Sequence, residues 1–162
     1  MREKSIELLN TALADELAAI HQYMYFHFRL DDLGYGPLSN QMKMTAIEEM
    51  THAEMIAERI LFLGGEVEMR VGRKVAKIHD AAAMIDRARE LETEAIKMYN
   101  DFAIQCAQNA DSGSKKVFED LVTAEEGHWD EFDRQADNLE RFGEQYLALQ
   151  GFNGGAEPGA GA

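Results

Sequence analysis

Apolar side chains recur every three or four residues along four long segments of the chain. In the first segment, residues 2–32, this series consists of Ile6, Leu9, Leu13, Leu17, Ile20, Met24 and Phe28. Such spacing places side chains on one face of an α-helix. The same pattern predicts helices over residues 39–63, 80–109 and 114–142, and a short helix over residues 144–150.

Capping and turn-forming residues separate these segments. Residues 33–37 contain two glycines and a proline, which predicts a turn, and Ser39 or Asn40 is expected to cap the second helix. A Gly-Gly pair that begins at Gly64 closes that helix, and Asp80 can cap the third. Each predicted helix therefore has a recognisable start or stop signal.

The lengths of the connections indicate the order in which the helices pack. Residues 66–80 have a weaker periodicity and form a long connection, whereas the first pair and the last pair of long helices are joined by short links. Helices of about 25 to 30 residues are about 40 Å long. We therefore expect an all-α, ferritin-like four-helix bundle with one long crossover between helices 2 and 3, plus a short C-terminal fifth helix. The bundle should span residues 1–150, and the Gly-rich residues 151–162 should form a disordered tail.

One glutamate lies within the apolar face of each long helix. In chain order these residues are Glu16, Glu49, Glu92 and Glu125. In the second and fourth helices a histidine follows three residues later on the same face, at His52 and His128. An isolated buried carboxylate is strongly unfavourable, so four glutamates that face the core require a common partner.

A pair of divalent metal ions fits these six side chains. Four carboxylate charges balance the four positive charges of two Fe²⁺ ions, and carboxylate oxygen and imidazole nitrogen suit iron or manganese. Four glutamates with two Glu-x-x-His motifs form the ligand set of the di-iron carboxylate bundles. The alternative, buried Glu–His pairs without metal, does not account for an inward glutamate on every long helix.

The composition excludes several other classes of protein. Among 162 residues, 30 are acidic and 16 are basic, which gives a net charge of −14. A protein that coats nucleic acid needs an excess of basic residues, so no nucleic-acid partner is expected. The single cysteine, Cys106, excludes a disulfide framework and a cysteine-rich metal site. Because neither a membrane-spanning apolar run nor a secretory signal is present, we expect a cytoplasmic protein without a membrane partner.

Three stretches around the candidate ligands resemble bacterioferritin. They are Asp-Glu-Leu-Ala-Ala-Ile-His-Gln-Tyr at residues 15–23, Ile-Glu-Glu-Met-Thr-His-Ala-Glu at residues 47–54, and Ala-Glu-Glu-Gly-His at residues 124–128. The likeness extends over about residues 5–150, and the second Glu-x-x-His motif is similar to bacterioferritin and unlike ordinary ferritin. The resemblance implies a ferroxidase centre in which Glu49 and Glu125 bridge two irons. The terminal ligands would then be Glu16 with His52 and Glu92 with His128.

The resemblance also implies a haem, and the helical position of a tyrosine suggests a role for it at the site. In the bacterioferritin family, a methionine directly after the bridging glutamate of the second helix ligates haem from both subunits of a dimer, and Met50 has this position. Tyr23 is expected beside Glu16, where it could hydrogen-bond a bridging carboxylate, donate one electron or simply pack in the core. Haem would carry electrons inward from a small ferredoxin-type donor.

Together these features predict an iron-storage and detoxification protein. Fe²⁺ would be oxidised by O₂ or H₂O₂ at the intra-subunit site, and the ferric product would be stored as mineral in a 24-subunit shell. One alternative is a rubrerythrin-like peroxidase or a manganese catalase, which would use the same bundle without storage. A second alternative is a helical interaction protein that takes up no metal.

Overall fold

Five α-helices account for nearly all of the regular structure in the computed structural model, which describes residues 2–153. Their bounds are Arg2–Asp32 for α1, Gly36–Phe62 for α2, Ala81–Gln108 for α3, Ser112–Phe142 for α4 and Glu144–Asn153 for α5. The described residues contain no β-strand. The prediction of an all-α bundle with a short fifth helix is confirmed.

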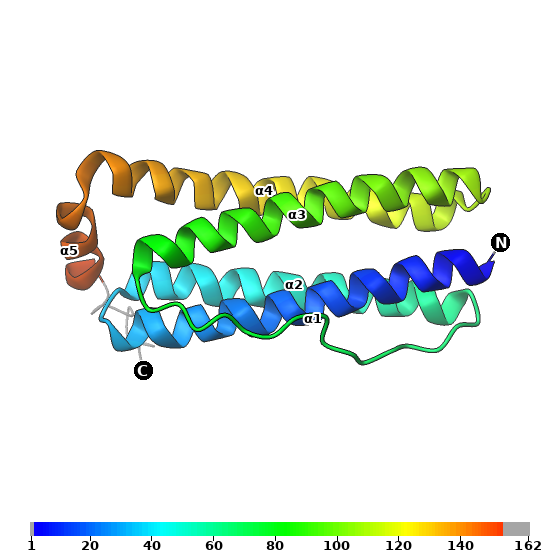
Figure 1. Ribbon diagram of the computed structural model, residues 1–162, viewed down its shortest axis with the longest axis horizontal. Helices are drawn as coiled ribbons and strands as arrows, with labels where there is room; N and C mark the ends of the chain where they lie inside the picture. The colour runs from blue at the N-terminus through cyan, green and yellow to red at the C-terminus, as the bar shows by residue number, and fades with distance from the viewer. Residues whose placement is uncertain (1, 154–162) are drawn as a thin grey trace, which may run out of the picture.

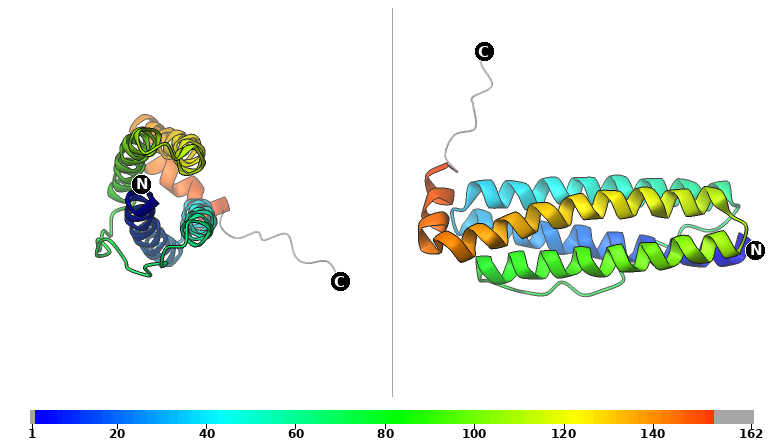
Figure 2. Two further views of the ribbon diagram at one scale, coloured as in Figure 1. Left: turned by 90° about the vertical axis from the view of Figure 1, so that its right-hand side faces the viewer. Right: turned by 90° about the horizontal axis from the view of Figure 1, so that it is seen from above.

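The four long helices form two hairpins that lie side by side (Figure 1). α1 packs antiparallel along α2, and α3 packs antiparallel along α4. The crossover segment, residues 63–80, runs the length of the bundle on its outer surface, so that α1 and α3 point in opposite directions (Figure 2). α5 lies across one end of the bundle and contacts α2 and α4. This is the predicted single-crossover arrangement.

Two helices begin earlier than their capping residues suggested. α2 begins at Gly36 rather than at Ser39 or Asn40, because Pro37 is accommodated in the first turn, where its missing N–H is not needed. α4 begins at Ser112 because the Asp111 side chain accepts a hydrogen bond from the Ser114 backbone N–H. The two other expected signals are present. The Asp80 side chain caps the start of α3, and Gly64 adopts a left-handed conformation just after the end of α2.

The prediction that a disordered tail begins at residue 151 is wrong. Residues 151–153 belong to α5, which continues beyond the expected end at residue 150. The remaining expected tail, residues 154–162, lies outside the described residues. Among the described residues, no helix is both long enough and apolar enough to cross a membrane.

The bundle core consists of two apolar clusters with a polar layer between them. One cluster contains Leu13, Ile56, Tyr99, Phe118 and their neighbours near one end of the bundle. The other lies toward the end capped by α5 and includes Tyr23, Phe26, Leu30, Met42, Met84 and Phe132. The six candidate ligands fall between these clusters in the sequence of every long helix, so the bundle holds them at mid-length, away from its ends.

Candidate metal centre

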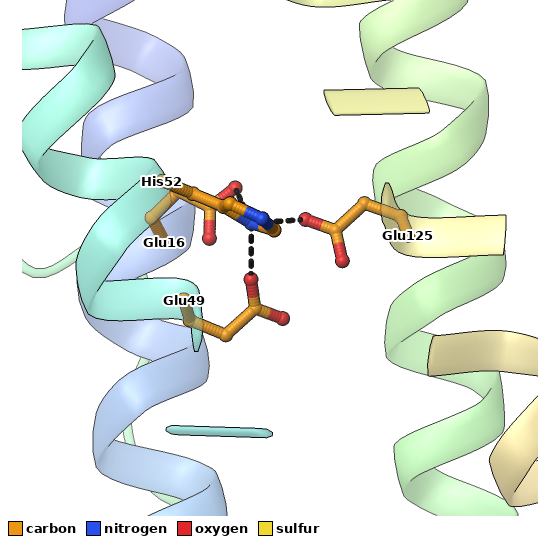
Figure 3. Close-up of side chains that lie close together, drawn as sticks. All are labelled: Glu16, Glu49, His52 and Glu125. Atoms are coloured by element: carbon orange, nitrogen blue, oxygen red, sulfur yellow. Dashed lines mark hydrogen bonds and ion pairs between the residues drawn. The ribbon is translucent and has the colours of Figure 1, made fainter. Parts of the chain in front are cut away.

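All six candidate ligands meet in the polar layer at the middle of the bundle. Glu16 comes from α1, Glu49 and His52 from α2, and the remaining ligands from α3 and α4. Every one of these side chains is buried, with the glutamates at no more than 2% relative exposure. Figure 3 shows Glu16, Glu49 and His52 facing Glu125 across the space between the two hairpins. The six residues predicted from their positions on the helices are therefore brought together by the fold.

The cluster divides into two groups of four residues that share two members. Within each group the candidate ligand atoms lie within 4.8 Å of one another. One group consists of Glu16, Glu49, His52 and Glu125, and the other of Glu49, Glu92, Glu125 and His128. Since Glu49 and Glu125 belong to both groups, they stand where carboxylates that bridge two ions would stand.

The two groups have almost the same geometry. The Nδ1 atom of His52 lies 2.8 Å from Glu49, 3.2 Å from Glu125 and 3.8 Å from Glu16. The Nδ1 atom of His128 lies 3.0 Å from Glu125, 3.3 Å from Glu49 and 3.7 Å from Glu92. Each imidazole thus turns the same nitrogen toward the carboxylates, and an ion in either group would meet three carboxylates and one imidazole.

Burial and mutual repulsion change the protonation of the carboxylates. Burial raises the pKa of Glu16 and of Glu92 well above the ordinary value, and the charges of Glu49 and Glu125 raise both further. For Glu125, burial acts in the same direction, but hydrogen bonds with His128 and His52 outweigh it and lower the pKa. Without metal, protonation is therefore favoured at the two terminal glutamates relative to Glu125.

The two histidines also hold protons in the absence of metal. Burial lowers the pKa of His52, but hydrogen bonds with Glu125 and Glu49 raise it to about 9. For His128 the same opposing effects, with hydrogen bonds to Glu125 and Glu49, raise the pKa to about 12. Positive charge is thus favoured at the positions where a divalent cation would lie.

The donor set fits two divalent cations better than it fits a purely internal network. Oε2 of Glu92 is buried without a hydrogen-bond partner, although its other oxygen is hydrogen-bonded. An orphaned buried carboxylate oxygen is unfavourable, and a cation coordinated by Glu92 would satisfy it. Oxygen and imidazole donors without thiolate are the chemistry that iron and manganese prefer.

Two tyrosines donate hydrogen bonds to the terminal glutamates. Tyr23 of α1 donates to Glu92 of α3, which is a terminal ligand in the expected set and not one of the two expected bridging glutamates. Tyr99 of α3 donates in turn to Glu16 of α1. Tyr99 is therefore a residue of the site that the expected set did not include. The signal was present, because Tyr99 follows Glu92 by seven residues, as Tyr23 follows Glu16.

A fifth glutamate supports one of the histidines from outside the cluster. Nε2 of His128 lies 2.5 Å from an Oε2 oxygen of Glu48, whose side chain is 57% exposed. A carboxylate on this nitrogen holds the ring so that Nδ1 can face a metal. Glu48 directly precedes Glu49 and points away from the apolar face, so helical register alone did not connect it with the site.

The remaining candidate, Met50, lies outside the cluster. Its side chain is 58% exposed on α2, with the apolar side chains of Met44 and Ile47 exposed nearby in sequence. Another histidine outside the cluster, His27, has a hydrogen-bond partner, since its Nδ1 lies 2.8 Å from the Ser39 hydroxyl. The structure therefore separates Met50 from the metal ligands and places it where another molecule can reach it.

Comparison with known proteins agrees with this geometry. Residues 6–142 match the family model for the ferritin-like domain. Bacterioferritin from Desulfovibrio desulfuricans is 37% identical over 91% of this chain and 82% of its own length, and that from Rhodobacter capsulatus is 38% identical over 90% and 91%. An X-ray structure of the D. desulfuricans bacterioferritin, which describes its diiron site in different catalytic states, superposes with a TM-score of 0.93. That match has 35% identity and covers 99% of this chain and 93% of the other. The chain therefore belongs to the bacterioferritin family, within the ferritin-like domain proteins.

Proposed function

We propose that the protein is a ferroxidase that oxidises Fe²⁺ to Fe³⁺ at the buried cluster between its two hairpins. The observation that carries this proposal is the pair of overlapping four-residue groups that share Glu49 and Glu125. Membership in the bacterioferritin family supports the same activity. Two bound Fe²⁺ ions lose one electron each, and with two protons these electrons reduce O₂ to H₂O₂ or H₂O₂ to two water molecules.

In this proposal each ligand has a definite role. Glu49 and Glu125 hold both irons, whereas Glu16 with His52 and Glu92 with His128 each hold one. Tyr23 and Tyr99 keep the terminal glutamates oriented through their hydrogen bonds. The apolar clusters on either side keep water from the site except where iron and oxidant enter.

We further propose iron storage in a 24-subunit shell, with the ferric product kept inside as mineral. The net charge of −14 supports this role, because acidic side chains that line a cavity would concentrate and nucleate Fe³⁺. Family membership supports the same assembly. Fe²⁺ and O₂ or H₂O₂ are then substrates, and a cytoplasmic location remains a prediction.

A haem held by Met50 from two subunits is the third part of the proposal. A thioether that is 58% exposed on α2, beside exposed Ile47, suits an apolar group that carries iron. The haem would pass electrons from a ferredoxin-type donor to the stored iron. Met50→Leu should remove the haem absorbance of the purified protein and leave its helical circular dichroism unchanged, whereas retained haem would exclude Met50 as a ligand.

Rapid mixing of metal-loaded protein with oxidant tests the ferroxidase site. Anaerobic protein with two Fe²⁺ per chain is mixed with buffer that contains O₂ or H₂O₂, and the near-ultraviolet absorbance of the ferric product is followed. Glu125→Ala and His128→Ala should slow the fast phase at least tenfold, because each removes a metal ligand, an effect on the order of those measured for metal-site residues.

The adjacent Glu126 supplies a matched control for this experiment. Glu126 is exposed on α4 and lies outside both groups, so Glu126→Ala should oxidise iron at the rate of the unmodified chain. Unchanged fast oxidation in both Glu125→Ala and His128→Ala would refute the site. Dismutation of H₂O₂ by the manganese-loaded chain, without retention of iron, would instead favour the non-storage alternative.

A further inference from the structure

A small cavity extends from the metal cluster toward the crossover segment. Its lining includes Glu16, Glu49, Glu92 and Glu125 and also two charged residues outside the ligand set, Asp15 and Arg73. The side chains of these four glutamates are at most 2% exposed, that of Asp15 is 18% exposed and that of Arg73 is 33% exposed. Exposure thus rises step by step along the cavity, so Asp15 and Arg73 stand between the buried carboxylates and solvent.

Arg73 has two acidic partners at different depths. Its Nη1 atom lies 2.7 Å from Oδ1 of Asp15 on α1 and 3.5 Å from Oε2 of Glu94 on α3. The Glu94 side chain is 52% exposed, whereas that of Asp15 is 18% exposed. A shift of the guanidinium toward Glu94 would keep it paired and would move it away from the cavity.

The crossover segment does not depend on Arg73 for its position. Asn10 of α1 donates to the Glu66 carbonyl and accepts from the Glu68 N–H, both at 2.9 Å. Further along, the Gln22 side chain donates to the Ala76 carbonyl at 3.0 Å and accepts from its N–H at 2.7 Å.

Between these two pairs of hydrogen bonds, the backbone of the crossover segment contacts α1. The Gly72 N–H donates to the Ala14 carbonyl at 2.9 Å. A β-carbon at residue 72 would lie 3.0 Å from that oxygen, so the close approach suits glycine. The backbone on both sides of Arg73 is therefore held by other contacts, and its side chain can move alone.

We propose that Fe²⁺ reaches the buried centre past Asp15, and that Arg73 is the gate on this path. In the closed arrangement Arg73 neutralises Asp15 and places a positive charge in front of an entering cation. When Arg73 turns to Glu94, the Asp15 carboxylate is free to receive the cation and pass it to Glu16, the next residue of the chain. This proposal rests on the proposed ferroxidase function, since it supplies that site with its substrate.

The two members of the ion pair should have opposite effects on metal entry. Arg73→Ala removes the positive charge and the obstacle while Asp15 stays, so cations should enter faster. Asp15→Asn removes the receiving carboxylate and leaves Arg73 in place, so cations should enter more slowly. If the pair only held the crossover segment, both substitutions would loosen the same contact and would act in the same direction.

Anaerobic Co²⁺ binding measures entry without turnover. Metal-free protein is mixed with Co²⁺ in a stopped-flow instrument, and the visible absorbance of bound Co²⁺ gives both the association rate and the number of ions bound. We expect two Co²⁺ per chain in every variant. The association rate should rise about threefold or more in Arg73→Ala and fall by a similar factor in Asp15→Asn, on the scale of electrostatic effects on cation association.

Arg70→Ala is the matched control, because Arg70 is an exposed arginine on the same segment and does not line the cavity. Its association rate should stay within a factor of about 1.5 of the unmodified chain, since a surface charge in water contributes little. Equal rates in the unmodified chain, Arg73→Ala and Asp15→Asn, with two Co²⁺ bound, would overturn the gate and leave the metal centre intact. Failure of the unmodified chain to bind Co²⁺ would overturn the metal centre and the gate with it.

Discussion

Two repeated residue spacings build the metal centre. A tyrosine follows the glutamate by seven residues on α1 and α3, and a histidine follows it by three residues on α2 and α4. Since α1 and α3 are antiparallel, each tyrosine reaches the glutamate of the other helix, which gives the pairs Tyr23–Glu92 and Tyr99–Glu16. Each phenol occupies one carboxylate oxygen and leaves the other for a metal ion.

Removal of one phenol should weaken one half of the centre. Tyr99→Phe frees an oxygen of Glu16, so one of two Co²⁺ equivalents should bind about tenfold more weakly, an effect at the lower end for residues that orient metal ligands. Tyr23→Phe should do the same for the ion held by Glu92, and the double variant should weaken both. Anaerobic titration followed by visible absorbance resolves the two equivalents.

Tyr25→Phe is the control for these two variants. Tyr25 is a half-buried tyrosine of α1 outside the cluster, so its loss of a hydroxyl should leave both equivalents unchanged. Identical titration curves for Tyr99→Phe and the unmodified chain would show that the phenol does not orient Glu16.

Metal uptake at neutral pH should release protons. The pKa of His52, raised to about 9 by hydrogen bonds with Glu125 and Glu49 against the effect of burial, leaves its ring protonated at pH 7. A metal needs the neutral imidazole, so binding expels this proton and becomes tighter as pH rises toward about 9. Calorimetry in buffers of different ionisation enthalpy counts the protons, and His52→Ala should release fewer per bound ion. Equal proton release from both proteins would contradict this protonation state.

The ligands of this site could be predicted from sequence, but some of their contacts could not. Glu16, Glu49, Glu92 and Glu125 are each an acid on an apolar helical face, which is a local property that a single helix displays. Which helix lies opposite Tyr23 depends on the path of the crossover segment, and no local pattern reports it. Arg73 illustrates the same limit, because its role comes from a connection that has weak periodicity and no helix of its own.

At the scale of elements, one polar network joins the end of α2 to the start of α4. Oδ1 of Asp111 accepts from the Ser114 N–H at 3.0 Å and from the Arg59 Nη2 at 2.7 Å. The Nε of Arg59 also donates to the Ser114 hydroxyl at 3.0 Å. A helix cap and an inter-hairpin contact thus share a single carboxylate, which explains why α4 begins before the residue that the sequence pattern favoured.

Asp111→Ala should lower the free energy of unfolding by about 1 to 2 kcal/mol, the usual effect of removing an N-cap acceptor. Burial alone would raise the pKa of Asp111, but hydrogen bonds with Ser114 and Arg59 lower it from 3.8 to about 2. Because the folded-state pKa is lowered, this stabilisation is present above about pH 3.8 and is lost as pH falls through about 2. Chemical denaturation at several pH values measures both effects.

An exposed ion pair on the same helix is the control for Asp111. Asp130 pairs with Arg134 at 2.6 Å, but the two side chains are 63% and 68% exposed. Asp130→Ala should therefore change the free energy of unfolding by less than about 0.5 kcal/mol. A similar loss in both variants would mean that the Asp111 network contributes no more than a surface contact.

At the scale of the whole molecule, one chain supplies all the candidate metal ligands but leaves apolar side chains of α2 exposed. Both groups of candidate ligands come from one chain, so a single subunit contains everything that the proposed oxidation needs. Met44, Ile47 and Met50 nevertheless leave apolar surface exposed at three-residue spacing along α2, with 40% to 58% relative exposure. Burial of such a stripe against another protein surface is more favourable than its exposure to water, and neighbouring subunits of the proposed shell would bury it.

A substitution in this stripe should therefore abolish iron storage without abolishing iron oxidation. Ile47→Glu places a charge on apolar contact surface, so sedimentation should show particles much smaller than those of the unmodified chain. Fast oxidation of two Fe²⁺ per chain should persist, because the site is intra-subunit, but further iron should precipitate instead of staying in solution. If the unmodified chain were itself a dimer without an electron-dense core, the shell and the storage role would both be refuted, and oxidation without storage would remain.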